Sequence, residues 1–335
     1  MDAAGTDSLL LTSNTSLCWY LDGSRVHISL AGAPIAAMLV THSGDHLVTF
    51  NNEAERMAAE EVPPEVSVHA APWHGSLEAV ARELAGSNPL AESEVAAQLR
   101  GARQAFLPAE STRYAQLNAD TAAVLTDVLS RATPGTTELE IAAQLASRIV
   151  AMGAEPLVLL CNGTTRSTFR HPLPTHNPLG RRAMAVVCAR RNGLVANATR
   201  WVRFDGGTPA ELDAESRLTA VEADIFDATV PGVRLNSIFR EIQRSYARNG
   251  FGPEQWTLHH QGGVAGYAGR DPRATAATED EVVLNQTFTW NPSGPSVKIE
   301  DTVQLTESGI AILSVDPRWP TTSVNGLQRP LTLEL

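Results

Sequence analysis

Apolar and polar positions alternate over short runs in the first hundred residues of the chain. This period of two predicts four strands, at residues 7–19, 25–30, 35–41 and 46–50. The SGDH segment at 43–46 predicts a hairpin turn between the last two strands. Two acidic, alanine-rich segments, 52–61 and 76–85, have helical spacing instead. Residues 1–100 are therefore predicted to form a small α/β domain.

Longer helical patterns begin at about residue 92. Helical spacing continues to about residue 130 and is interrupted only around Pro108. A further amphipathic segment ends near Met152, and at its start Thr137 and Glu140 have the spacing of a capping box. The change from short strands to long helices predicts that a second domain occupies residues 101–335.

The same turn-and-helix pattern occurs twice in this second domain. PGTTELEI starts at Pro134, and PGVRLNSI starts at Pro231, about a hundred residues later. Strand-like segments follow each copy, at 157–161 and 183–189 and then at 281–290 and 301–306. A repeat of this kind indicates an internally duplicated domain of the α+β class, in which helices cover strands.

Charge and composition narrow the classes of partner. The chain has 26 Lys and Arg residues against 37 Asp and Glu residues, a formal charge of −11, and Lys298 is its only lysine. Binding to nucleic acid or to an anionic membrane requires a clustered basic surface, so neither is expected as a partner.

Targeting and cysteine patterns point to the cytoplasm. The apolar stretch 30–40 is too short to span a bilayer, and no basic segment of a secretory signal precedes it. The three cysteines are widely spaced, which excludes a disulfide framework and a CxxC metal site. We expect Cys18, Cys161 and Cys188 to be reduced and buried; Cys188 as a nucleophile is an alternative without an evident base.

Several motifs then occur in a characteristic order. They are TPGTTELEIAAQLASRIVAMGAEP, His171-Pro, Asn192-Gly, Asn197-Ala-Thr-Arg, His259-His260-Gln-Gly-Gly, Phe-Thr-Trp290-Asn291-Pro and Ile-Glu300-Asp-Thr-Val. This order resembles the pita-bread family of methionine aminopeptidase, aminopeptidase P, prolidase and creatinase. Residues 1–100 also resemble the small N-terminal domain of the creatinase and aminopeptidase P branch. The resemblance implies a creatinase-like N-terminal domain followed by a duplicated pita-bread domain.

The metal ligands of this family are largely replaced. In its peptidases two Asp, one His and two Glu residues bridge a pair of divalent metal ions, which need anionic oxygen and imidazole ligands. The motifs place these ligands at Val186, Asn197, about Gly262, Asn291 and Glu300. Only Glu300 keeps a strong ligand group. We therefore expect no metal at this site and no other cofactor.

The remaining histidines do not offer an alternative metal site by their spacing. No histidine pair is joined by a carboxylate at a recognised ligand spacing. Surface or otherwise satisfied positions are expected for His27, His42, His46, His69 and His74. Only His171 and the adjacent His259 and His260 lie in segments that resemble the walls of a site.

The resemblance to creatinase suggests how the site works without metal. Creatinase uses a histidine as acid/base at the position that His171 matches, and an imidazole both gives and takes a proton near neutral pH. Arg270 matches an arginine that binds substrate, and its guanidinium suits a carboxylate; the alternative is a solvated loop arginine beside Asp271. Asn291 replaces a carboxylate that holds creatine, so creatine itself is not the expected substrate.

Further side chains are candidates for substrate binding. His260, Asn197, Asn291 and Trp290 lie in the same motifs as His171 and Arg270. Asn keeps the shape of a carboxylate without its charge, whereas the alternative is drift after metal binding was lost. Trp290 suits the floor of a small-molecule pocket, although a buried tryptophan in the core is the commoner case.

Three functional hypotheses remain open. The first is a metal-independent, creatinase-like hydrolase or lyase that acts on a small carboxylate-bearing amide, guanidino or related C–N substrate, with His171 as acid/base and Glu300 as its charged partner. The second is a non-catalytic protein that binds peptide or protein in the same pocket. The third is an Xaa-Pro aminopeptidase-like metallopeptidase whose ligands lie elsewhere. The resemblance to creatinase also implies a homodimer.

Overall fold

The computed structural model describes Met1 and residues 5–335. The chain divides into two compact units, one of residues 1–103 with 192–194, the other of residues 104–191 and 195–335. The first unit thus ends three residues beyond the boundary at 100 that the change in pattern predicts.

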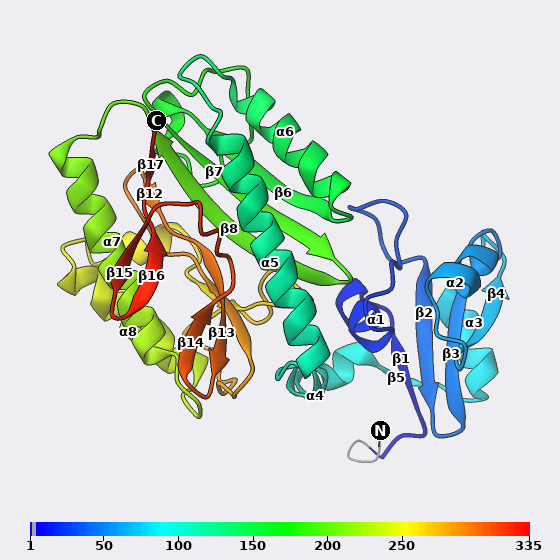
Figure 1. The fold of residues 1–335 in the computed structure, drawn as a ribbon. Coiled ribbons are helices and arrows are strands. Elements are labelled where there is room, and N and C mark those ends of the chain that lie inside the picture. Colours follow the sequence, from blue (N-terminus) through cyan, green and yellow to red (C-terminus); the bar gives the residue numbers. More distant parts are fainter. Residues whose placement is uncertain (2–4) are drawn as a thin grey trace. The chain divides into compact units, whose positions relative to one another are not determined.

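The first unit is built on a five-stranded sheet with the order β4-β3-β2-β1-β5 (Figure 1). Its strands are β1 (Ser8–Leu11), β2 (Ala36–Thr41), β3 (Gly44–Phe50), β4 (Ser67–Ala71) and β5 (Leu90–Ala91). Its helices are α1 (Asn14–Tyr20), α2 (Ala54–Glu60), α3 (Leu77–Ala85) and α4 (Ala96–Ala102). The predicted hairpin is present, since β2 and β3 pair in antiparallel fashion with Thr41 opposite Gly44.

Two strand predictions in this unit are wrong. The predicted strand 7–19 is a strand only to Leu11, and α1 follows it. The Ser13 side chain caps this helix by accepting a hydrogen bond from the backbone N–H of Ser16, a local signal that overrides the apolar alternation. Residues 25–30, the second predicted strand, contain no strand.

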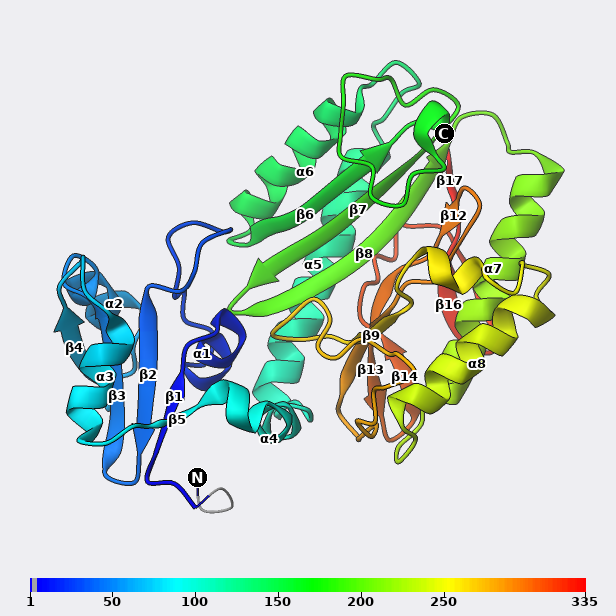
Figure 2. The same ribbon diagram turned by 180° about the vertical axis from the view of Figure 1, so that it is seen from behind.

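The second unit begins with two helices and a sheet. Helices α5 (Pro108–Leu129) and α6 (Glu138–Ala151) lie against one face of a sheet with the order β17-β8-β7-β6. The long strands of that sheet are β6 (Glu155–Asn162), β7 (Arg182–Arg191) and β8 (Leu194–Arg203), with β17 (Leu333–Glu334) at its edge. Figure 2 shows the other face of the sheet, which α5 and α6 leave uncovered.

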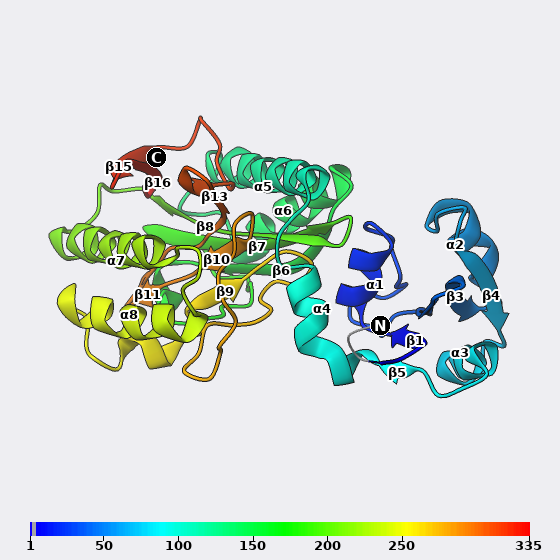
Figure 3. The same cartoon turned by 90° about the horizontal axis from the view of Figure 1, so that it is seen from below.

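The second half of this unit repeats the plan. Helices α7 (Pro209–Ala228) and α8 (Leu235–Arg248) lie side by side in Figure 3, and Ser245 and Arg248 of α8 both hydrogen-bond to Asp224 of α7. Their sheet has the order β14-β13-β10-β9. Its strands are β9 (Gly262–Val264), β10 (Thr287–Trp290), β13 (Asp301–Thr306) and β14 (Gly309–Ile312). The unit also contains two short strand pairs: β11 (Ser293–Gly294) with β12 (Val297–Lys298), and the hairpin β15 (Thr321–Val324) with β16 (Leu327–Pro330).

Backbone hydrogen bonds confirm the predicted duplication. At the start of α6, the N–H of Glu138 donates to Asn177 O at 3.0 Å, and the next N–H donates two residues earlier, to Thr175 O. At the start of α8, the N–H of Leu235 donates to Asp280 O at 3.0 Å, and the next N–H donates to Thr278 O. Both turn-and-helix units are therefore fixed to their own half by the same pair of bonds. The α+β class and pita-bread architecture are confirmed.

The structure also contains elements that the pattern analysis missed. Helix α7 has 20 residues, and strand β8 was recognised only as a motif. The Thr208 side chain accepts from the N–H of Glu211, and the Glu211 side chain accepts from the N–H of Thr208, the same capping box as at Thr137. The predicted strand 281–290 is shorter, because only its last four residues form β10.

The sheets of the two halves meet along β8 and β13. The N–H of Thr199 donates to Glu300 O at 3.0 Å, and the N–H of Asn197 donates to Thr302 Oγ1 at 3.1 Å. This junction brings residues about a hundred positions apart to one place. No helix in the described part of the chain is both long and apolar enough to cross a membrane.

Candidate functional site

A buried carboxylate with two cationic partners lies at this junction. One oxygen of Glu300 accepts hydrogen bonds from Lys298 Nζ at 2.6 Å and from Thr199 Oγ1 at 2.8 Å. Its other oxygen accepts from Arg270 Nη2 at 2.8 Å. The side chains of Glu300, Lys298 and Arg270 are each less than a tenth exposed. We refer to these four residues as the Glu300 cluster.

The local backbone explains why Lys298 and Glu300 meet. Lys298 ends β12, and Glu300 directly precedes β13. In extended backbone, residues two positions apart project to the same side, so the ammonium and the carboxylate are neighbours. Strand β8 adds Thr199 from the other half of the unit.

The electrostatics of the cluster keep Glu300 charged. Burial alone would raise the pKa of Glu300, but the charges of Lys298 and Arg270, with hydrogen bonds from Lys298 and Thr199, hold it well below its usual value. The cluster therefore contains two cations and one carboxylate. Its excess positive charge favours an anionic group of a ligand over a second cation.

Arg270 is not the solvated loop arginine of the alternative interpretation. Its side chain is 7% exposed and pairs with Glu300. Its buried Nε has no hydrogen-bond partner among the described residues. One donor of the guanidinium is thus occupied by Glu300, while another remains without an acceptor.

Three histidines form a second group, which we call the histidine cluster: His171, His259 and His260. Nε2 of His171 lies 3.0 Å from Nε2 of His259, and the rings of His259 and His260 stack with their centroids 4.4 Å apart. Nδ1 of His259 lies 2.7 Å from the carbonyl oxygen of His260. Because a carbonyl only accepts, Nδ1 of His259 carries the hydrogen, and Nε2 of the neutral ring is an acceptor. Nε2–H of His171 is then the donor between the two rings.

Asn291 connects the two clusters. Its Oδ1 accepts from Arg270 Nη2 at 3.4 Å, and its Nδ2 donates to the carbonyl oxygen of His260 at 3.2 Å. A continuous polar path therefore runs from Glu300 through Arg270 and Asn291 to the histidines. The hydrogen-bond partner of the His171 ring is His259, and Glu300 acts on it from further along this path.

A carboxylate next to His171 would raise the pKa of its imidazole, but the pKa of His171 is lowered. Burial and the charge of Lys298 lower the pKa of His171, and Glu300 opposes them only in part. Burial lowers the pKa of His259 to about 4, with Lys298 adding to the effect, and that of His260 to about 3, with His259 and Arg270 adding to it. All three rings are therefore neutral at pH 7.

Two predicted binding residues lie in the packed interior. Trp290 is fully buried in the core and stacks on Phe288 with ring centroids 5.8 Å apart, and it lines neither of the two cavities described below. Asn197 is 1% exposed, and its Nδ2 donates to Val195 O at 3.0 Å, which leaves its amide within the sheet junction. The remaining predicted residues His171, His260, Arg270, Asn291 and Glu300 come together as one polar group.

Lys298, Thr199 and His259 were not among the site residues predicted from the sequence. The sequence does indicate Lys298 as a site residue, because it is the only lysine in the chain and lies two residues before Glu300. His259 had a weaker signal, its adjacency to His260 in a suspected wall segment. The interpretation of Cys188 as a nucleophile loses support, since burial raises the pKa of its thiol to about 12 and Glu300 adds to the effect.

A narrow cavity of about 10 Å³, room for roughly one water molecule, touches both clusters. Its lining includes Arg170, Trp201, His259 and Lys298. The Arg170 guanidinium donates to Gly294 O at 2.6 Å, and burial lowers the pKa of Arg170. The walls of this cavity therefore combine an apolar ring with two cationic groups and an imidazole.

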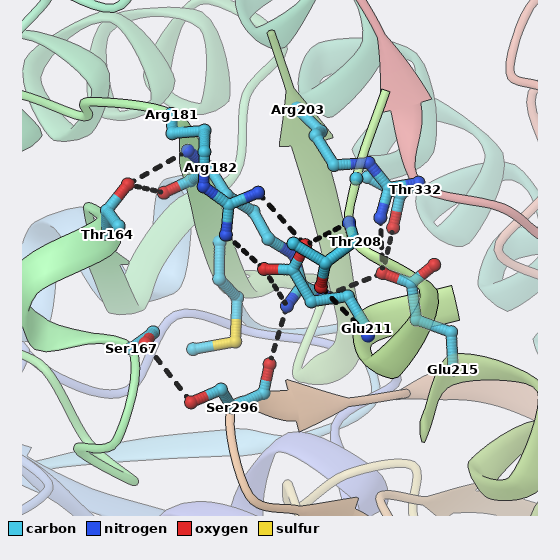
Figure 4. Close-up of polar contacts among 12 residues, drawn as sticks. Thr164, Ser167, Arg181, Arg182, Arg203, Thr208, Glu211, Glu215, Ser296 and Thr332 are labelled. Carbon is cyan, nitrogen blue, oxygen red and sulfur yellow. Dashed lines mark hydrogen bonds and ion pairs between the residues drawn. The ribbon is translucent and has the colours of Figure 1, made fainter. Parts of the chain in front are cut away.

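A larger cavity of about 420 Å³ shares Trp201 and Lys298 with the narrow one. The Arg182 guanidinium lies 4.0 Å above the Trp201 ring. It donates to Glu215 at 2.7 Å and to Ser296 O at 2.9 Å (Figure 4). These contacts hold Trp201 against the site, and the Trp201 indole in turn donates to Lys298 O at 2.9 Å.

The two-metal centre implied by the fold does not fit the residues present. Val186 is buried and has no ligand atom, and Gly262 has no side chain. A Cβ at Gly262 would lie 2.3 Å from Thr289 O, at a backbone φ of +115°, so this position could not carry a histidine without rearrangement. Both oxygens of Glu300 are already bound by Lys298 and Arg270. Two side-chain cations thus occupy the carboxylate that would bridge two metal ions.

Comparison with known proteins agrees with the fold and the motif order. A model of metallopeptidase family M24 matches residues 113–307. The chain therefore belongs to metallopeptidase family M24. None of the curated proteins compared with it is similar enough to count as a match.

Solved structures resemble the chain over nearly its whole length. The prolidase from Pyrococcus horikoshii OT3 is 18% identical, with 95% of this chain and 96% of that chain covered and a TM-score of 0.77. The dipeptidase PepE from Mycobacterium ulcerans is 20% identical, with 100% and 95% covered and a TM-score of 0.77. The N-terminal domain of the FACT complex subunit SPT16 from Cicer arietinum is 13% identical, with 93% and 91% covered and a TM-score of 0.68. At these identities the similarity establishes the fold.

Proposed function

We propose that the chain is a creatinase-like enzyme that acts on a small carboxylate-bearing amide, guanidino or related C–N substrate without a two-metal centre. The observation that carries this proposal is the pairing of Glu300 with both Lys298 and Arg270. A peptidase of this fold needs that carboxylate for metal ions, whereas here it orients two cations. Family membership supports hydrolysis as the reaction type.

The excess positive charge supports a carboxylate on the substrate. Lys298 and Arg170 line the narrow cavity, and a charge-assisted hydrogen bond to a carboxylate is roughly twice as strong as one between neutral groups. The Trp201 ring offers an apolar face in the same cavity. An anionic group suits these walls, although the cavity, at about 10 Å³, must widen to admit a substrate.

His171 suits the proton-transfer role. Its Nε2–H donates to His259, which leaves Nδ1 of the neutral ring as the atom that accepts a proton. In hydrolysis Nδ1 takes a proton from the attacking water, and the imidazolium returns that proton to the leaving nitrogen. His259 is a positioning residue, since it fixes the tautomer of His171 and is itself held by the carbonyl of His260.

The test is a substrate panel assayed in EDTA. The panel contains N-acyl amino acids, guanidino acids and Xaa-Pro dipeptides. We expect turnover of a member of the first two classes, and a loss of roughly 10²–10⁴-fold in kcat for His171→Asn. The exposed His176 provides the control, because His176→Asn should retain the rate. Cleavage of Xaa-Pro dipeptides that requires added Mn²⁺ or Co²⁺ would favour a metallopeptidase instead.

A second candidate is non-catalytic binding of peptide or protein. The similarity to the SPT16 domain, a part of the FACT complex, favours this function. It predicts no turnover for any member of the panel and unchanged ligand binding in His171→Asn.

A further inference from the structure

We propose that His171, His259 and His260 form a binding site for a single transition-metal ion of the Zn²⁺ type, and that this ion inhibits the enzyme. The site is distinct from the carboxylate-rich two-metal centre, whose residues are replaced. Metal binding by the three histidines is independent of the proposed function, whereas inhibition rests on it.

The distances between the rings suit one ion. Each histidine offers a ring nitrogen, and the three ligand atoms lie within 4.8 Å of one another. Nitrogens bound to one tetrahedral Zn²⁺ at about 2.0–2.1 Å are separated by about 3.4 Å. The 3.0 Å between the Nε2 atoms of His171 and His259 is close to this value. A small rotation of the His260 ring would complete the set.

The surroundings orient these ligands as they do in metal sites. Nδ1–H of His259 donates to the carbonyl oxygen of His260, so its Nε2 lone pair faces His171. A metal-ligating histidine usually donates its other ring N–H in this manner. Nδ1 of His260 is buried without a hydrogen-bond partner among the described residues, and a metal ion would satisfy such an atom. His171 is exposed, which provides an entry path and an open coordination position.

The type of ligand selects the kind of ion. The ligands are neutral imidazoles, and the excess positive charge of the neighbouring Glu300 cluster opposes every divalent cation alike. Hard cations such as Mg²⁺, Mn²⁺ and Ca²⁺ require anionic oxygen ligands, which this site lacks. Zn²⁺, Ni²⁺ and Co²⁺ bind well to neutral imidazole. The site therefore distinguishes these ions from those that prefer carboxylates.

Metal binding and proton transfer exclude each other at His171. In the metal-free site Nε2 of His171 carries the hydrogen and Nδ1 accepts the substrate proton. To bind an ion through Nε2, the neutral ring moves its hydrogen to Nδ1, with no net gain or loss of a proton. The basic lone pair is then occupied by the metal. Zn²⁺ should therefore inhibit the enzyme, and EDTA should restore activity.

The experiment measures binding without any substrate. Full-length protein is stripped with EDTA, and Zn²⁺ alone is titrated by calorimetry, with Co²⁺ absorbance as a spectroscopic check of nitrogen ligation. We expect one site per chain, an increase in the melting temperature with Zn²⁺, and no binding of Mg²⁺ or Mn²⁺. His260→Ala and, at the exposed position, His171→Ala should each weaken Zn²⁺ affinity by more than about tenfold.

The chain offers a matched control in its other unit. Nδ1 of His46 lies 3.1 Å from Nε2 of His69, which is a pair of imidazoles without a third. His69→Ala should leave Zn²⁺ binding unchanged. Loss of binding in His69→Ala, with binding retained in His171→Ala and His260→Ala, would overturn the proposal, as would the absence of Zn²⁺ binding. Binding of Zn²⁺ by a protein that turns over no substrate would retain the metal site and reject the proposed function.

Discussion

At the residue scale, the central feature is a buried carboxylate, that of Glu300, which is bound by the side-chain cations of Lys298 and Arg270. A lysine or arginine delivers one positive charge with directional hydrogen bonds, whereas a divalent metal delivers two with open coordination positions. The Glu300 cluster therefore keeps a positive field but cannot activate a water molecule in the manner of a metal ion. The proposed function assigns proton transfer to the His171 imidazole.

The pairing of Lys298 with Glu300 should contribute strongly to stability. Removal of one partner of a buried ion pair leaves an uncompensated charge and typically costs about 3–5 kcal/mol. The loss of stability caused by Lys298→Met should lie near the lower end of this range, because Arg270 and Thr199 still bind Glu300. Urea unfolding measures the change. Arg244→Met, in an exposed pair with Glu241 at 3.6 Å, should change the unfolding free energy by less than about 1 kcal/mol.

An equal effect of the two substitutions would mean that the buried pair contributes no more than an exposed one. The double variant Lys298→Met/Glu300→Gln distinguishes the interaction itself from other effects of each substitution. It should be less destabilised than the sum of the single variants, since no unpaired carboxylate remains.

The stability contribution of Glu300 should depend on pH. Its pKa in the folded protein lies below the value of about 4.3 in an unfolded chain. The ionised carboxylate therefore stabilises the fold fully above that value, and the contribution is lost as pH falls towards the lowered folded pKa. Glu300→Gln should be much less stable than the wild type at pH 7, and the difference should shrink below about pH 4. Unfolding free energies measured from pH 7 to pH 3 provide the test; a constant difference would contradict it.

At the element scale, capping residues decide where the long helices begin. Thr137 starts α6 and Thr208 starts α7 through the same reciprocal bonds with a glutamate three residues later. Helix α7 packs against the core of the second half and lines the larger cavity. Fraying of the first turn of α7 would therefore also affect this core and the wall of the larger cavity.

Loss of the α7 cap should destabilise the protein. Thr208→Ala removes the side-chain acceptor for the N–H of Glu211 and should cost about 1 kcal/mol, within the usual range for a helix cap. Ser216→Ala, at an exposed position within the same helix, is the control and should change stability by less than about 0.5 kcal/mol. The midpoint of chemical unfolding measures both. Equal changes in stability for Thr208→Ala and Ser216→Ala would show that the capping box does not stabilise the protein.

Local signals account for what the sequence could predict at this scale. The hairpin at 43–46, the capping box of α6 and the repeated turns depend on neighbouring residues, and all three are present. The prediction of a strand at 7–19 was wrong because Ser13 caps a helix within an apolar run. In the site, motif order led to His171 and Glu300, but the hydrogen bond from Thr199 to Glu300 across the junction joins residues about a hundred positions apart. No local pattern encodes such a contact.

At the scale of the whole molecule, the duplication explains why one site is assembled from both halves. Thr199 comes from the first half, whereas Arg270, Asn291, Lys298 and Glu300 come from the second. A buried network of Arg329 with Glu222 and Asp301 lies in the second half next to the junction. Since the halves share β8–β13 contacts, a change in either half reaches the same group of side chains.

The chain is expected to form a homodimer with two-fold symmetry, the commonest arrangement among oligomers and the one implied by the creatinase-like architecture. Light scattering coupled to size exclusion should give a mass of about twice 35.8 kDa at micromolar concentration. A mass of one chain over the whole range from 1 to about 50 μM would reject this expectation.

Because Lys298 is the only lysine in the chain, chemical labelling of its amine can measure how often the surrounding structure opens. Amine-directed acylating reagents meet a single lysine side chain in the sequence, and that side chain is 8% exposed and bonded to Glu300. Acylation of Lys298 therefore requires a transient opening of the structure around the Glu300 cluster. The rate of labelling, measured by mass spectrometry of the peptide that contains Lys298, therefore reports the rate of this opening. A ligand that fills the cavity should lower the labelling rate.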